Sequence, residues 1–153
     1  MIQFYFKTVR DEEFQLIPHI REGCWIHVDE ATQEALAPFA QVLGLELIDL
    51  HDCLDKYEIP RIERMGSCVI IFTRHPTEYE VGLYTSTFAI ILTSHYVVTI
   101  SPHKSCLIHN FVVQSNKLST LQKSKLLIAL FLRITHEFNI GAATRKRNDC
   151  SRK

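Results

Sequence analysis

The sequence is short of glycine, and its glycines do not cluster as they do in a phosphate-binding loop. Five glycines stand alone, at positions 23, 44, 66, 82 and 141. A P-loop or a dinucleotide-binding turn needs several glycines in one short segment, because the backbone must approach the phosphates closely. No serine lies in the Gly-x-Ser-x-Gly pattern of a nucleophile elbow. The common nucleotide-binding and serine-hydrolase signatures are therefore excluded.

Cysteine and histidine are present, but not at spacings typical of metal sites or disulfide frameworks. The five cysteines are odd in number and form no Cys-x-x-Cys pair, so reduced thiols are the plainer interpretation. No two of the eight histidines have the His-Glu-x-x-His spacing of a zinc enzyme. His103 and His109 flank Cys106, which is a weak zinc pattern, and His27 between apolar neighbours favours a packed or hydrogen-bonded side chain. We predict that the chain is not an enzyme.

Net charge and long apolar segments are also missing. Seventeen basic residues balance seventeen acidic ones, whereas nucleic-acid binding needs an excess of Lys and Arg on one face. We therefore expect no nucleic-acid partner. The longest apolar run, Leu126 to Leu132, has seven residues, but a membrane-spanning helix needs about 20. Because the N-terminus also lacks a signal-peptide pattern, we expect a chain that is soluble by itself.

Apolar segments alternate with turn residues in a way that predicts interleaved strands and helices. One helix should begin after Asp29 or Thr32 and end at Gly44, with Pro38 kinking it or delaying its start. A second should cover Leu118–Phe138. The pattern favours an α/β fold of the α+β kind, a three-layer α/β/α sandwich with a mixed sheet. The expected strands are Ile2–Val9, Phe14–Ile17, Cys24–Val28, Ile59–Met65, Cys68–Arg74, Leu83–Leu92 and Tyr96–Ser101, with a loop over Pro76–Val81.

The chain divides into an expected domain of residues 1–139 and a tail of residues 140–153. From Arg145 to Lys153 the tail has five basic side chains, one acidic side chain and no periodicity, so we expect disorder. The central turns of the last helix, Leu126 to Leu132, are apolar all round, which indicates deep burial or a partner. If it were left exposed, this surface would favour self-association.

The segment from Gly44 to Arg64 has the densest pattern of candidate ligands. Asp49, Asp52 and Asp55 recur every three positions, and leucines at positions 47, 50 and 54 form a stripe on the expected helix. Asp49 and Asp52, roughly opposite that stripe, could serve a loose Mg²⁺ site that keeps several waters. From the spacing alone we favour a solvated acidic face, and a metal site would need another chain to complete it.

An ordered set of segments supports a family resemblance. They are Gly23–Val28, Thr32, Gly44–Leu45, Leu50–Asp55, Pro60–Glu63, Ile90–Thr93, Val97–Ile100 and the helix from Leu126 to Phe138. In this order and at these spacings they resemble the N-terminal cytoplasmic domain of the CorA family of magnesium and cobalt transporters. The resemblance extends over about residues 1 to 139.

The resemblance implies a soluble α/β/α domain that hangs from a stalk helix in a homopentameric channel, on the cytoplasmic side of the inner membrane. Divalent ions bound between neighbouring domains would hold the pore closed. The family's regulatory acid corresponds to Asp52. The implied function is thus that of a regulatory domain that senses divalent cations, with Mg²⁺ as the regulatory ion and Asp52 as half of its site.

The chain also departs from the family pattern. His51 stands where the family often has Glu, and imidazole suits transition metals better than Mg²⁺. Leu132 stands about where the family has a further acid on the last helix. The stalk carboxylate, the transmembrane helices and the Gly-Met-Asn motif are absent from these 153 residues. The resemblance therefore implies a domain that cannot transport alone, with no tightly bound cofactor.

Two other classes of protein stay open at this point. A soluble α/β adaptor or ligand-binding domain, unrelated to transport, could share this layout, and a stable monomer indifferent to divalent ions would favour it. A metallo-enzyme built on the histidines would require tight zinc binding. The sequence of the gene beyond residue 139 would separate the transporter interpretation from both.

Overall fold

The computed structural model describes residues 1–79, 82–104, 106–114 and 117–150, with only the backbone of residues 78–79, 82–83 and 141–150. Within these residues seven strands form one sheet in the order β2-β1-β3-β7-β6-β5-β4. The strands are β1 (Ile2–Phe6), β2 (Gln15–Leu16), β3 (Trp25–Asp29), β4 (Arg61–Met65), β5 (Cys68–Tyr79), β6 (Gly82–Leu92) and β7 (Val97–Ser101).

The sheet is mixed, as the sequence predicts. β3 pairs in parallel with β7, and the other described pairs are antiparallel. Every residue of β3 and β7 is buried, because both strands lie in the middle of the sheet with helices on each side. The apolar run in Cys24–Val28 therefore reflects burial on both faces.

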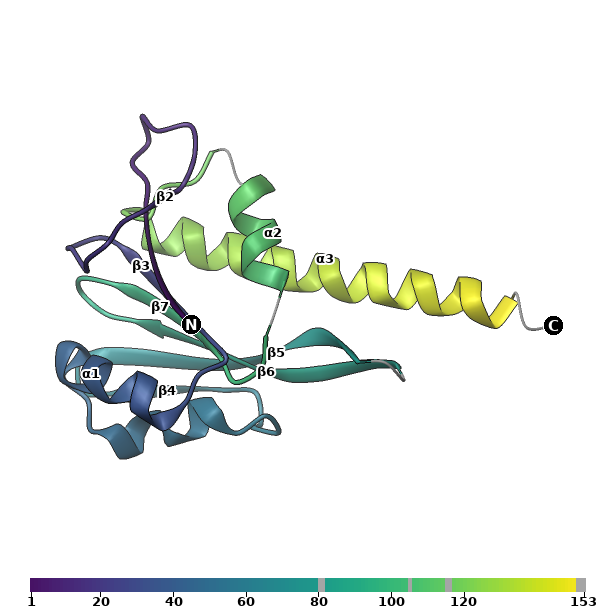
Figure 1. Ribbon diagram of the computed structural model, residues 1–153, viewed down its shortest axis with the longest axis horizontal. Helices are drawn as coiled ribbons and strands as arrows, with labels where there is room; N and C mark the ends of the chain where they lie inside the picture. The colour runs from purple at the N-terminus through teal and green to yellow at the C-terminus, as the bar shows by residue number, and fades with distance from the viewer. Residues whose placement is uncertain (80–81, 105, 115–116, 151–153) are drawn as a thin grey trace.

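Helices cover both faces of the sheet and give the three-layer α/β/α sandwich that the sequence predicts (Figure 1). The helix α1 (Gln33–Leu43) and the 3₁₀ helix η1 (Leu47–Leu54) pack on one face. The helices α2 (Cys106–Gln114) and α3 (Lys123–Cys150) pack on the other. Each face has its own apolar core, so the sheet separates two sets of side chains.

Local capping chemistry determines where α1 begins and ends. The Thr32 hydroxyl accepts a hydrogen bond from the Ala35 N–H at 3.3 Å, which satisfies a donor in the first turn. Gly44 ends the helix in the left-handed conformation, at φ +68°, and its N–H bonds the Gln41 carbonyl at 3.2 Å. Pro38 lies inside the helix on its exposed side and does not end it.

Three expectations about local structure are wrong. Asp49 and Asp52 lie in a 3₁₀ helix rather than an α-helix, and Asp55 follows its end. β5 continues to Tyr79, through Pro76, where a loop was expected; positions 80 and 81 of that expected loop lie outside the described residues. The helix α2 was not expected at all.

The last helix differs from its prediction at both ends. It begins at Lys123 rather than Leu118, and its backbone stays helical to Cys150, which lies within the tail of residues 140–153. The prediction of an irregular tail therefore does not match the backbone of residues 140–150, and residues 151–153 lie outside the described part of the chain. The division into a domain of residues 1–139 and a tail stays a prediction.

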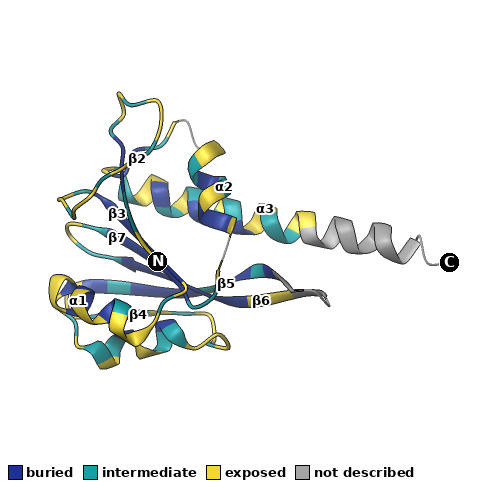
Figure 2. Cartoon of the chain, viewed as in Figure 1, coloured by how far each residue is buried: buried dark blue, intermediate teal, exposed yellow. Residues whose placement is uncertain are grey.

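One side of α3 faces the core and the other faces outward (Figure 2). Leu126, Leu130 and Ile134 are buried against the sheet, whereas Ile128 and Leu132 are 60% and 66% exposed. The fold therefore buries one side of the apolar turns of this helix and leaves the other side exposed. In the part of the chain that the structure describes, no helix combines the length and the hydropathy needed to cross a bilayer.

Candidate functional site

Of the three regularly spaced aspartates, Asp49 and Asp52 lie in η1 and Asp55 directly follows it, and the three have different roles. A 3₁₀ helix has three residues per turn, so side chains three positions apart lie along one line. Asp49 accepts a hydrogen bond from the Glu46 N–H at 2.9 Å, at the start of η1. Asp55 accepts one from the Tyr57 N–H at 2.8 Å, in the turn that follows. Asp52, between them, is the one of the three with an ion pair to a strand.

Asp52 pairs with the guanidinium of Arg61 on β4. Its Oδ2 accepts from Arg61 Nη2 at 2.6 Å, while 46% of the Asp52 side chain stays exposed. His51 lies on the outer side, with Nδ1 3.8 Å from Asp52 Oδ1 and 68% of its side chain exposed. One carboxylate oxygen of Asp52 is therefore held by arginine, and the other faces His51.

Arg61 also binds two further carboxylates. Its Nε donates to Glu63 at 2.6 Å, two positions along the same strand, and its Nη1 donates to Glu58, just before the strand. The guanidinium carbon lies 4.1 Å from the ring centroid of Phe72 on β5, within cation–π range. The hydrogen bond to Glu63, and after it that to Asp52, raises the pKa of Arg61, so the arginine stays charged.

Apolar side chains beneath these polar groups fix η1 on the sheet. Leu50 and Cys53, three positions apart, are fully buried in the core that α1 shares. Burial, and after it the Asp52 charge, raises the pKa of the Cys53 thiol to about 12. Cys53 therefore stays a neutral thiol and packs as a small apolar side chain. This anchoring leaves Asp52 on the outer side.

A second arginine fastens the segment between η1 and β4. Arg74 on β5 donates to the carbonyls of Lys56 and Glu58, at 3.2 and 3.1 Å. It also bonds the hydroxyl and carbonyl of Thr85 on β6, at 2.8 and 2.6 Å. The loop that presents Glu58 is thus tied to the β5–β6 hairpin, which limits how far the carboxylates can move apart.

Within the described residues, no three His, Cys, Asp or Glu side chains come together in a way that could hold a metal ion. The weak pattern of His103, Cys106 and His109 therefore gives no such group. Around Asp52 the residues fit only part of a hard-cation site. Mg²⁺ uses one or two carboxylates and keeps waters, and Asp52 Oδ1 can supply one such oxygen. His51 adds an imidazole, which suits Mg²⁺ poorly.

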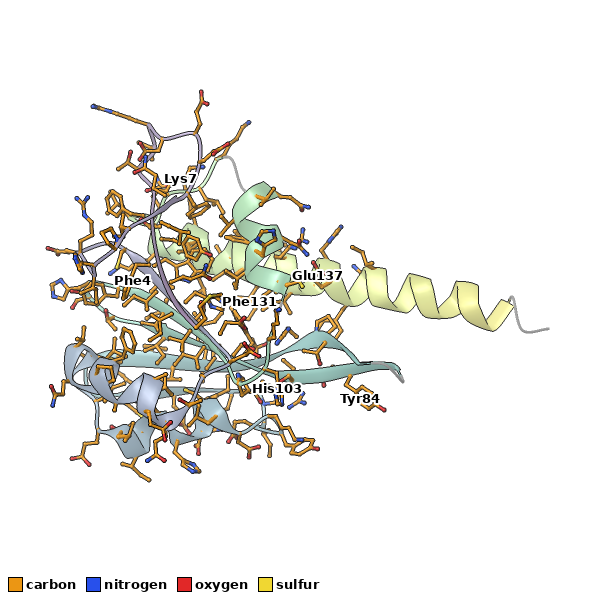
Figure 3. The ribbon with its side chains drawn as sticks, viewed as in Figure 1. Phe4, Lys7, Tyr84, His103, Phe131 and Glu137 are labelled. Carbon is orange, nitrogen blue, oxygen red and sulfur yellow. The ribbon has the colours of Figure 1, made fainter. Side chains whose placement is uncertain are left out.

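Leu132 does not lie near Asp52. It is on α3, and so are Phe131 and Glu137, which Figure 3 labels on the helix that crosses the opposite face from η1. The sheet and both apolar cores lie between the two layers. Asp52 and the position of Leu132 therefore cannot contact one ion within a single chain.

The sequence did not single out Arg61, Glu58 or Glu63 as site residues. A signal was present, because Arg61 and Glu63 are two apart on a predicted strand and so share a face. Their link to Asp52 depends on how η1 packs over β4. His27, in contrast, is as predicted: it is buried, and its Nδ1 lies 2.9 Å from the Thr99 hydroxyl.

Comparisons with known proteins agree on a family and a fold. The sequence model described as "CorA-like Mg2+ transporter protein" matches residues 21–144. No curated protein matches the chain. Among solved structures, the soluble domain of CorA from Methanocaldococcus jannaschii is 19% identical, with a TM-score of 0.80, over 97% of this chain and 61% of that one.

Two other structures match at similar coverage. The complete CorA magnesium transporter of the same organism is 19% identical, with a TM-score of 0.77, over 96% of this chain and 48% of that one. The ZntB cytoplasmic domain from Vibrio parahaemolyticus is 10% identical, with a TM-score of 0.71, over 95% of this chain and 62% of that one. At these identities the likeness shows the fold, and this chain spans less than two thirds of each matched structure.

Proposed function

The chain belongs to the CorA-like Mg²⁺ transporter protein family, and we propose that it serves there as a regulatory domain that senses divalent cations. The observation that supports this most is the family match over residues 21–144, on a fold like that of the CorA soluble domain. The proposal assigns transport to a stalk and a pore outside these 153 residues. The domain binds rather than catalyses, and lies on the cytoplasmic side of the inner membrane.

In this proposal Asp52 contributes one side of a site between two copies of the domain. Its Oδ1 is the oxygen that Arg61 does not hold, and it lies on the outer side of η1. A Mg²⁺ ion there would keep most of its waters and reach a carboxylate of the neighbouring copy, in a homopentamer. The ion stabilises the closed assembly over the open one only by its difference in affinity for the two.

A half-site of this kind binds weakly in a single copy. One exposed carboxylate with water offers few fixed ligands, so the affinity of the isolated domain for Mg²⁺ should be on the order of millimolar, as in loose Ca²⁺ sites. Weak binding suits a sensor, since the ion must leave when its concentration falls. No tightly bound cofactor is part of this proposal.

Sedimentation velocity of the chain in EDTA and in about 10 mM MgCl₂ tests the sensing role, since that concentration would fill a millimolar site. We expect Mg²⁺ to raise the weight-average sedimentation coefficient of the wild type, and Asp52→Asn to abolish the rise. Asp55→Asn is the matched control, because it removes the same charge from the next turn and should keep the rise. A wild type that sediments identically in both solutions would overturn the proposed function.

A further inference from the structure

Arg61 joins more negative charge than one guanidinium neutralises. It donates to Asp52, Glu58 and Glu63, so three carboxylates face one cation and the group has a net charge of −2 (three negative, one positive). The donors of Arg74 are directed to backbone carbonyls and to Thr85 instead of to these carboxylates. The cluster is therefore a place where a second cation lowers the repulsion among the acids.

The three carboxylates differ in how firmly they are held. Glu58 and Glu63 lie three and two positions from Arg61 in the sequence, and their side chains are 15% and 33% exposed. Asp52 belongs to η1, nine residues away, and its side chain is 46% exposed. Because Arg61 is fixed against Phe72 and keeps Glu58 and Glu63, it can lose Asp52 and still be paired.

We propose that Arg61 competes with a divalent cation for the Asp52 carboxylate. The cation must displace Arg61 or share the carboxylate with it, so Arg61 sets the cation concentration at which the site fills. The proposal rests on the function proposed above and names the residue that regulates that site. Arginine suits the role because its planar fork binds several carboxylates at once and stays charged at all physiological pH values. Arg61 acts through Asp52 and is thus a positioning residue.

Exchange at Asp52 also has a structural consequence. The Asp52–Arg61 pair is a direct side-chain link between η1 and β4. When a cation binds Asp52 Oδ1, it draws negative charge away from Oδ2, so the bond between Oδ2 and Arg61 weakens while the Glu58 and Glu63 bonds of Arg61 remain. Cation binding is therefore coupled to the position of η1 on the sheet, and a ligand that binds one position better shifts the population toward it.

Isothermal titration calorimetry with MgCl₂ tests the competition on the 153-residue chain. Arg61→Met removes the charge and keeps an apolar stem against Phe72. We expect this variant to bind Mg²⁺ at least about tenfold more tightly than the wild type, because a charge-assisted bond no longer competes for Asp52. The double variant Arg61→Met/Asp52→Asn should lose that gain. An unchanged Kd in Arg61→Met would overturn the proposal.

Arg64→Met is the matched control, because Arg64 is exposed on the same strand and three positions along, where the side chain points to the other face. It removes the same charge, so an equal gain in both variants would mean a general electrostatic effect and would contradict the proposal. If Arg61→Met does not fold, Arg61→Lys serves instead. It keeps the charge but has a single ammonium in place of the planar fork, so a Kd lower than that of the wild type supports the competition, whereas a Kd equal to that of the wild type contradicts it.

The ¹⁵N–¹H signal of the Arg61 Nε group gives a readout that a purely structural role would not move. We expect it to shift during the Mg²⁺ titration of the wild type and to stay fixed in Asp52→Asn. Failure of this inference differs from failure of the proposed function. Mg²⁺-dependent assembly through Asp52, with Arg61→Met equal to Arg64→Met, removes only the role of Arg61. Competition at Asp52 without any assembly removes only the sensing role.

Discussion

Two histidines are buried in the face of the sheet that α2 and α3 cover. His27 on β3 lies beside Thr99, and His75 on β5 contacts the ring of Phe88 edge to face. Burial lowers the pKa of each from 6.5 to about 4. Both are therefore neutral in the folded protein at neutral pH, and they act as hydrogen-bonding members of the core rather than as ligands.

These two residues predict that the domain loses stability in mild acid. Because the unfolded chain binds protons below pH 6.5 and the folded chain only near pH 4, stability is fully present above about 6.5 and is lost as the pH falls toward 4. The loss should be on the order of 3 kcal/mol for each histidine. Urea unfolding at several pH values between about 7 and 4.5 measures it.

The variant His27→Asn identifies the source of that pH dependence. Asparagine can place a nitrogen near the position of Nδ1 but does not titrate, so the variant should show a smaller change in unfolding free energy over the same pH range. His109→Asn, at an exposed position on α2, should keep the wild-type slope. Equal slopes in all three proteins would mean that His27 does not contribute.

At the scale of elements, hydrogen bonds of nearby residues determine where the helix α1 begins and ends. Thr32→Ala removes the side-chain oxygen that accepts from the Ala35 N–H, and should reduce the unfolding free energy by about 1 kcal/mol. Thr32→Ser keeps the hydroxyl and should stay close to the wild type. Chemical denaturation of the three proteins measures the difference, and a Thr32→Ala midpoint equal to that of the wild type would exclude a role for the cap.

Elements of this kind could be predicted because their signals are local. The bounds of α1 follow from Thr32 and Gly44, and the burial of β3 follows from its apolar run. The course of β5 could not be predicted in this way. Beyond Phe72, β5 no longer has β4 beside it, so its outer edge is open and tolerates the missing N–H of Pro76.

The helix α2 and the pairing of Asp52 with Arg61 could not be predicted from the sequence either, for two other reasons. In α2 the core residues Leu107, Ile108 and Phe111 are mixed with β-branched neighbours, which weakens a helical pattern. Asp52 could be singled out because the sequence alone shows that it corresponds to an acidic residue of the family. Its pairing with Arg61 depends on the packing of η1 against β4, and the spacing of the two residues along the sequence does not give the distance between their side chains.

At the scale of the whole molecule, the outer side of α3 has an apolar patch made of Ile128 and Leu132, one helical turn apart. We predict that this patch supports weak self-association of the chain. Changing both residues to Ser should lower the weight-average mass measured by light scattering at high protein concentration. Val9→Ser, at an exposed loop position, should not. Equal masses for all three proteins would count against the patch.

The η1 layer and the α3 layer lie on opposite faces of the sheet and expose different side chains. The symmetry of an assembly therefore depends on which of these layers are in contact. A contact between the α3 patches of two copies uses the same surface twice, so it is isologous and closes as a dimer. A contact from the η1 layer of one copy to the α3 layer of the next is heterologous. It adds copies around a rotation axis until a ring closes, or it continues as a filament. The stoichiometry of the assembled protein therefore reports which layers meet.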